Sequence, residues 1–112
     1  MVPKLTSSPF GGRTRTGILV ALKLLEASYG RELARLLVCQ PSGVRKALVS
    51  LERNGLVSGR AVGRTRVFQL SPTYFAAREL GQYLARLADA DPLLRTRVAA
   101  LRRRPRRTEK PL

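Results

Sequence analysis

Two neighbouring stretches of the chain carry positively charged side chains at spacings that suit contact with a polyanion. In the first, 41–54, apolar Val44, Leu48 and Leu51 recur at helical spacing, and polar or cationic residues occupy the opposite face. In the second, 56–70, three arginines and no acid surround a central glycine. Because Lys and Arg side chains bind phosphates and guanine edges, both stretches are candidate nucleic-acid contacts.

The polar face of the first stretch predicts contacts with base edges in a major groove, where small side chains let a helix approach closely. The predicted base-contacting residues are Gln40, Ser42, Arg45, Lys46 and Val49. The residues predicted to contact the DNA backbone or minor groove are Arg53, Arg60, Arg64 and Arg66. A solvated helix face would carry similar residues, and hairpin charges also discourage edge pairing. The two stretches together favour binding.

The residue pattern around these stretches predicts the elements that hold them. A helix over 31–38 is followed by a turn over 39–43 and a second helix over 41–54. Two strands follow, over 56–62 and 65–70, with a glycine between them. A winged helix-turn-helix has this order of elements and places one helix in a DNA major groove. The predicted fold class is therefore mainly α with a small two-stranded β-wing.

Two further helices are predicted on either side of this arrangement. The first covers 13–27 and is apolar on two opposite sides, so a C-terminal helix or a second subunit is expected to cover the second side. Ser28 and Tyr29 are predicted to open the next helix, and an amphipathic helix is predicted over 74–88. The candidate dimer-interface residues on these helices are Val20, Leu24, Leu80, Tyr83, Leu84 and Leu87.

The chain of 112 residues has room for one domain and little more. Residues 1–12 carry Pro, Gly and Ser pairs and are expected to form a flexible arm. Residues 13–88 form the predicted winged helix-turn-helix domain. Residues 89–112 are expected to be a basic tail, partly helical and then disordered, with a short helix around Leu94, Val98 and Leu101.

The overall charge narrows the class of partner. Lys and Arg number 22 against 7 Asp and Glu, which gives a formal net charge of +15. Such an excess favours polyanions, with nucleic acid ahead of an anionic membrane surface. No apolar run approaches the roughly 20 residues of a membrane span, and the first residues lack the pattern of a secretory signal. A cytoplasmic, nucleoid-associated protein is expected.

Residue types that most catalytic sites need are missing. The sequence has no His, so it has no histidine general base, no Ser-His-Asp arrangement and no His metal site. The acids are scattered, and no enzyme activity, cofactor, metal or small-molecule ligand is expected. The single cysteine, Cys39, precedes the second helix, where cations could activate a thiol that senses oxidation. A small apolar side chain that fills the turn is the alternative.

The chain resembles small prokaryotic winged helix-turn-helix transcription regulators of the MarR and ArsR types. The likeness rests on RELARLL, QPSGVRKALVSLERNGLV and GRAVGRTRVFQLSP, and it covers Thr14 to Ala88. It implies that 41–54 reads a major groove, that 60–66 touches the backbone or minor groove, and that the chain pairs as a homodimer through its terminal helices. Metal-sensing ArsR-type proteins use paired Cys or His and acidic clusters, which this sequence lacks, so metal sensing is not expected.

The sequence therefore predicts a sequence-specific regulator that binds double-stranded DNA. As a dimer it would recognise two half-sites about 10 base pairs apart. Two alternatives remain open: a winged-helix adaptor that binds protein or RNA, and a nonspecific chromatin-type DNA-binding protein. The RRRPRR stretch near the C-terminus fits any of the three, because it adds affinity without sequence information.

Overall fold

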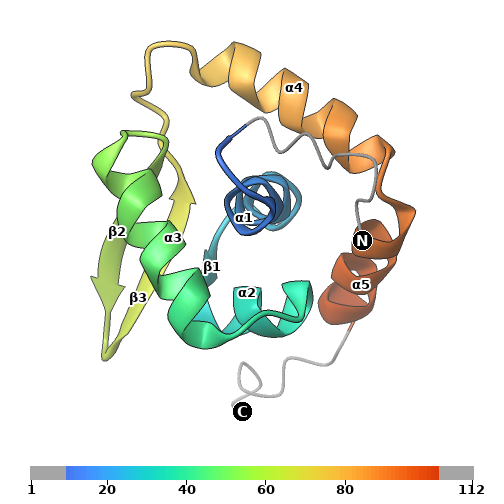
Figure 1. Ribbon diagram of the computed structural model, residues 1–112, viewed down its shortest axis with the longest axis horizontal. Helices are drawn as coiled ribbons and strands as arrows, with labels where there is room; N and C mark the ends of the chain where they lie inside the picture. Colours follow the sequence, from blue (N-terminus) through green and yellow to red (C-terminus); the bar gives the residue numbers. More distant parts are fainter. Residues whose placement is uncertain (1–9, 104–112) are drawn as a thin grey trace.

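The computed structural model describes residues 10–103, and one helix lies at its centre (Figure 1). The elements are, in order, α1 (Arg13–Leu25), β1 (Ser28–Tyr29), α2 (Gly30–Leu37), α3 (Pro41–Arg53), β2 (Val57–Val62), β3 (Thr65–Leu70), α4 (Ala77–Asp89) and α5 (Pro92–Arg103). Figure 1 looks nearly down the axis of α1, and α2, α3, α4, α5 and the sheet surround it. The prediction of a mainly α, winged helix-turn-helix fold is confirmed. Residues 1–9 of the predicted arm and residues 104–107 of the RRRPRR stretch lie outside the described residues.

The central helix α1 explains the two apolar sides seen in the sequence. Five consecutive residues, Ile18 to Leu22, are each at most 2% exposed, so the helix is buried all round at its middle. α1 contacts all four other helices, and in Figure 1 α3 lies to its left, α2 below it, α4 above it and α5 to its right. The second apolar side of α1 is therefore covered by C-terminal helices of the same chain. α1 ends at Leu25 rather than Ala27, because the backbone of Glu26 has a positive φ of 74°, which a right-handed helix does not allow.

The sheet has three strands in the order β1-β3-β2, all antiparallel, rather than the two that were predicted. Ser28 and Tyr29 form the third strand instead of opening α2, and they pair with Phe68 and Val67. A strand of two residues is too short to show an alternating pattern, and its partner lies almost 40 residues away in the sequence. The β2–β3 hairpin, called the wing below, turns at Gly63, whose φ of +66° suits a two-residue loop.

The C-terminal helices complete the core. Asp91 precedes α5, and its Oδ1 accepts a hydrogen bond of 3.2 Å from the amide of Leu94, as an N-cap residue does. Leu94 and Val98 are buried in the same hydrophobic cluster as the residues of α1. The first part of the segment predicted as a tail is thus a helix of 12 residues that packs into the core.

Two arginines of α5 are bound to backbone carbonyls near the ends of other helices. Arg97 Nη1 donates to the carbonyl of Leu36 over 3.0 Å, and Arg102 Nη2 donates to the carbonyl of Leu24 over 2.8 Å. Cationic donors at helix C-termini satisfy carbonyls that have no partner within the helix. These two arginines hold α5 against α1 and α2, so part of the positive charge of the chain is not available to a partner.

Three of the residues predicted for a dimer interface lie inside the subunit, and that part of the prediction is wrong. Val20, Leu84 and Leu87 are buried where α1 and α4 meet, so a second copy cannot reach them. Leu24 and Leu80 are half-buried against the same core. Tyr83 is 45% exposed, and the centroid of its ring lies 5.9 Å from that of the Phe10 ring.

Within residues 10–103, none of the helices has the length and apolar character that a membrane span requires.

Candidate nucleic-acid interface

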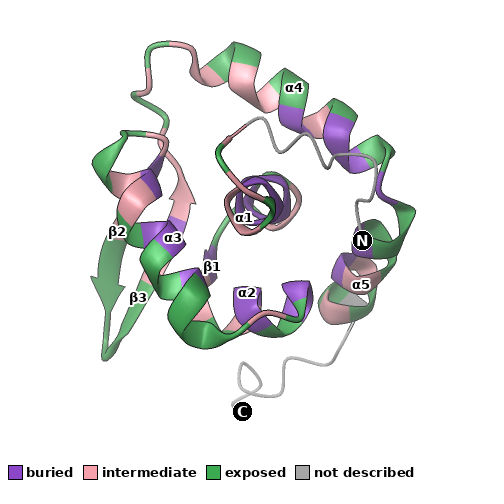
Figure 2. Ribbon diagram, in the orientation of Figure 1, coloured by how far each residue is buried: buried purple, intermediate pink, exposed green. Residues whose placement is uncertain are grey.

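α3 turns an apolar face to the core and a polar face to solvent. Val44, Leu48 and Leu51 are 0%, 2% and 0% exposed, as the sequence pattern predicted. Figure 2 shows the buried residues of α3 on the side that faces α1 and the exposed residues on the opposite side. This exposed side, the outer face of α3, consists of Ser42, Arg45, Lys46, Val49 and Arg53. A helix held in this way presents cations and small side chains, including the apolar Val49, while its other large apolar residues are buried against the core.

The N-terminal end of α3 carries no negative charge. Pro41 occupies the first turn, where its missing amide hydrogen is not needed. Gln40 stands at the cap position, is exposed, and does not cap the helix with its side chain. The first turn contains no acid, so the positive end of the helix dipole is not offset there. This end of the outer face is therefore electrostatically suited to an anionic partner.

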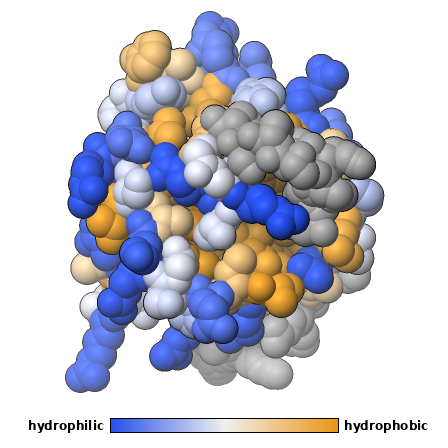
Figure 3. Space-filling view, in the orientation of Figure 1, coloured by the Kyte–Doolittle hydropathy of each residue, from blue (hydrophilic) through white to orange (hydrophobic). Residues whose placement is uncertain are grey.

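The register of the wing separates its three arginines. Directly opposed residues share a face of the sheet, so Arg66, paired with Ala61, lies on the face that also carries Gly59 and Phe68. Arg60 pairs with Val67 and lies on the other face. Arg64 lies in the turn at the tip. Figure 3 shows strongly hydrophilic side chains projecting at the lower left, the corner where Figure 1 places this tip.

Arg66 differs from the other two because it has a partner inside the chain. Its Nη2 lies 2.6 Å from Oε2 of Glu52, which is on α3. The described residues contain one other ion pair, between Arg95 and Asp89, so Arg60 and Arg64 take part in none there. The sequence predicted the same role for all three arginines of the wing. In the structure, Arg60 and Arg64 remain free to bind an external anion.

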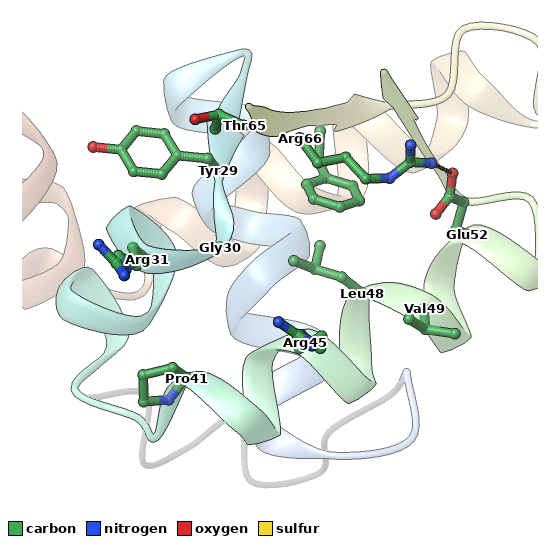
Figure 4. A pocket seen from close by; sticks show the side chains of 11 residues that line it. Tyr29, Gly30, Arg31, Pro41, Arg45, Leu48, Val49, Glu52, Thr65 and Arg66 are labelled. Atoms are coloured by element: carbon green, nitrogen blue, oxygen red, sulfur yellow. Dashed lines mark hydrogen bonds and ion pairs between the residues drawn. The ribbon is translucent and has the colours of Figure 1, made fainter. Parts of the chain in front are cut away.

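A groove of ≈ 750 Å³ separates α3 from the wing and from the start of α2 (Figure 4). Its lining includes Arg45 and Val49 from the outer face of α3 and Thr65 and Arg66 from the wing. Tyr29, Gly30 and Arg31 line it from the junction of β1 with α2. The sequence analysis missed these three, because their part in the groove depends on the pairing of β1 with β3. Arg31 is exposed and adds a further cation to this side of the molecule.

Arg15 of α1 is a further residue whose role the sequence did not predict. Its Nη1 donates to the hydroxyl of Ser50, and its Nη2 donates to Oδ1 of Asn54 over 3.0 Å. Its Nε donates to the carbonyl of Phe10. The last turn of α3 is therefore attached to the central helix, which fixes the direction in which the outer face points. No periodic pattern could reveal this contact, since it joins residues 35 and 39 positions apart.

Cys39 lies half-buried in the turn between α2 and α3. Its Sγ lies 3.5 Å from the carbonyl oxygen of Leu37 and 4.0 Å from Oγ1 of Thr14. The side chain also packs against the hydrophobic core. These contacts support the interpretation of Cys39 as a small side chain that fills the turn. Residues 10–103 contain no group of three or more side chains that could hold a metal ion.

Comparison with known proteins gives matches among solved structures only. No family model and no curated protein sequence matches the chain. The adhesin competence repressor of Streptococcus pyogenes is 17% identical, with a TM-score of 0.60 over 87% of this chain and 72% of that one. A mutant MarR from E. coli is 13% identical, with a TM-score of 0.61 over 88% and 72%.

A third similar structure has a higher sequence identity. It is a MarR family transcriptional regulator from Silicibacter pomeroyi, 24% identical, with a TM-score of 0.59 over 88% of this chain and 70% of that one. At these identities the likeness concerns the fold. The helices, the three-stranded sheet and these matches together show that the chain has the winged helix-turn-helix fold found in MarR-family transcription regulators.

Proposed function

We propose that this chain is a sequence-specific transcription regulator that binds double-stranded DNA. The observation that carries the proposal is the position of the outer face of α3 beside the wing tip, where both are exposed and cationic. A helix of this kind fits a major groove, and a basic hairpin beside it reaches the adjoining backbone. The similar solved structures include a repressor and transcriptional regulators, which supports the same class.

Within this proposal the exposed residues have distinct roles. The residues expected to meet base edges are Gln40, Ser42, Arg45, Lys46 and Val49. Arg53, Arg60 and Arg64 are expected to meet the backbone or minor groove, because they are exposed cations without an ion-pair partner in the described part of the chain. Catalysis is not part of the proposal.

The direct test is selection of bound duplexes from a random DNA pool at about 0.15 M salt, where weak charge contacts are screened. A regulator should enrich one compact motif and prefer it over unrelated DNA by roughly a thousandfold or more. Tight binding without enrichment would instead identify a nonspecific chromatin-type protein. Binding of structured RNA or of an acidic protein in preference to any duplex would identify an adaptor.

We further propose that the protein acts as a homodimer in the cytoplasm. Leu24, Leu80 and Tyr83 remain available for an interface, since each retains exposed surface on α1 or α4. Two copies related by a two-fold axis would place their α3 helices on half-sites about 10 base pairs apart. Sedimentation of the free protein and the symmetry of the selected motif test this together. A monomer that selects an asymmetric motif would contradict it.

Replacement of Arg64 by alanine should weaken binding to every duplex by a similar factor. Arg64 lies at the wing tip and is expected to contact a phosphate, which carries no sequence information. The slope of log K against log salt should become shallower by about 0.9, the value for one phosphate contact. Titration of labelled duplexes at several salt concentrations measures both effects. An unchanged slope would remove Arg64 from the interface.

A further inference from the structure

The side chain of Arg66 runs along the face of the wing toward α3 and does not project from its tip. Figure 4 shows its guanidinium reaching across the groove to Glu52. The guanidinium carbon lies 5.6 Å from the centre of the Phe68 ring, in the range of a cation–π contact. Phe68 is two residues further along β3, on the same face, and is buried. Arg66 is thus supported from below by an aromatic ring and held at its end by a carboxylate.

Gly59 makes room for this arrangement. It is the cross-strand partner of Phe68 on β2. A Cβ at this position would lie 2.8 Å from Cε2 of Phe68 and 3.1 Å from Nε of Arg66. Both distances are shorter than ordinary van der Waals contact, so any other residue would displace the ring and the guanidinium. A glycine here lets β2, Phe68 and Arg66 stack closely.

The pair also has an electrostatic consequence. Glu52 is the one acid of α3, and it lines the groove between this helix and the wing. An unpaired carboxylate there would repel a phosphate backbone. Arg66 neutralises this charge, and its own charge is used in doing so. The side chains of Arg66 and Glu52 are 52% and 33% exposed, so the pair adds little to stability in itself.

We propose that Arg66 is a positioning residue: with Phe68 and Glu52 it fixes the wing against α3 and neutralises the only carboxylate of that helix. This inference rests on the proposed DNA-binding function, and it gives Arg66 another role than the DNA contact that the sequence predicted. Arg64 meets the phosphate, whereas Arg66 sets the angle at which Arg64 is presented.

The test compares two variants that differ in what they remove. Arg66→Met with Glu52→Gln removes one charge of each sign and keeps the formal net charge at +15. Arg64→Met removes one unpaired cation. Each is titrated with a duplex recovered from the random pool, over a range of salt concentrations. Circular dichroism confirms that each variant is folded.

The double variant should bind up to about fivefold more weakly at every salt concentration, because the wing is no longer held against α3 and an exposed ion pair contributes little. Its salt slope should equal that of the unchanged protein, because no phosphate contact is lost. Arg64→Met should make the slope shallower by about 0.9. If the double variant also loses about 0.9 from its slope, Arg66 is a phosphate contact and the inference is wrong.

Single variants complete a double-mutant cycle. Arg66→Met alone exposes the Glu52 carboxylate and should bind more weakly than the double variant. Glu52→Gln should therefore restore affinity in the Arg66→Met background and give no such gain in the unchanged protein. An equal gain in both backgrounds would show that the two side chains act independently. If the unchanged protein binds no duplex, the proposed function fails, whereas a slope change at Arg66 overturns only this inference.

Discussion

Lys46→Ala is expected to reduce the preference of the protein for its selected DNA sequence by about 5- to 150-fold, which corresponds to about 1–3 kcal/mol for one specific base contact. Lys46 lies on the outer face of α3, exposed, with the core residues Val44 and Leu48 on the opposite side. A side chain in this position reaches base edges when the helix enters a major groove. Competition among duplexes that differ at single base pairs would show relaxed preference at one position and its symmetry mate.

The matched control for this change is Arg86→Ala. Arg86 is also an exposed cation on a helix, but it lies on α4, away from the outer face of α3 and the wing. Its loss removes the same charge and should leave the sequence preference unchanged. Should Arg86→Ala relax the preference as much as Lys46→Ala does, the binding face would not be the one assigned to α3.

Leu51→Ala is expected to lower the free energy of unfolding by about 2–5 kcal/mol, the usual cost of truncating a fully buried leucine. Leu51 is completely buried where α3 packs on α1 and the sheet. For a chain of this size, a loss near the upper end would leave little of the total stability. Thermal or urea unfolding followed by circular dichroism measures the change.

Val49→Ala on the same helix serves as the comparison. Val49 is 48% exposed on the outer face, so its truncation should change the unfolding free energy by roughly 0.5 kcal/mol or less. It is also a predicted base contact, and its loss should appear in DNA binding. A larger stability loss for Val49→Ala than for Leu51→Ala would mean that α3 is rotated relative to the assigned faces.

The parts of the fold that could be predicted from the sequence are those with a local signal. The apolar spacing of Val44, Leu48 and Leu51 predicted the buried face of α3, and the structure confirms it. Strand β3 follows the predicted bounds over 65–70. The turn at Gly63 also follows from the residue type, since glycine favours the positive φ found there. Each of these features depends on residues close together in the chain.

The features that could not be predicted depend on contacts between distant segments. Two-residue β1 forms only because β3 is available to pair with it. Val20 and Leu84 looked available for a dimer because the sequence does not show that α4 and α5 cover α1 within one subunit. The partners of several arginines could not be predicted either. Arg66 pairs with Glu52, Arg15 donates to Ser50, and Arg97 donates to the carbonyl of Leu36. Charged residues show this most clearly, because their roles depend on what lies opposite them.

We propose that the outer face of α3 and the wing tip form the surface that meets DNA. Backbone amide shifts in nuclear magnetic resonance spectra, recorded while a selected duplex is added at about 0.15 M salt, would locate this surface. The largest shifts should fall on residues 40–53 and 60–66, with α4 and α5 little affected. Shifts concentrated on α4 and α5, with residues 40–53 unchanged, would contradict the claim.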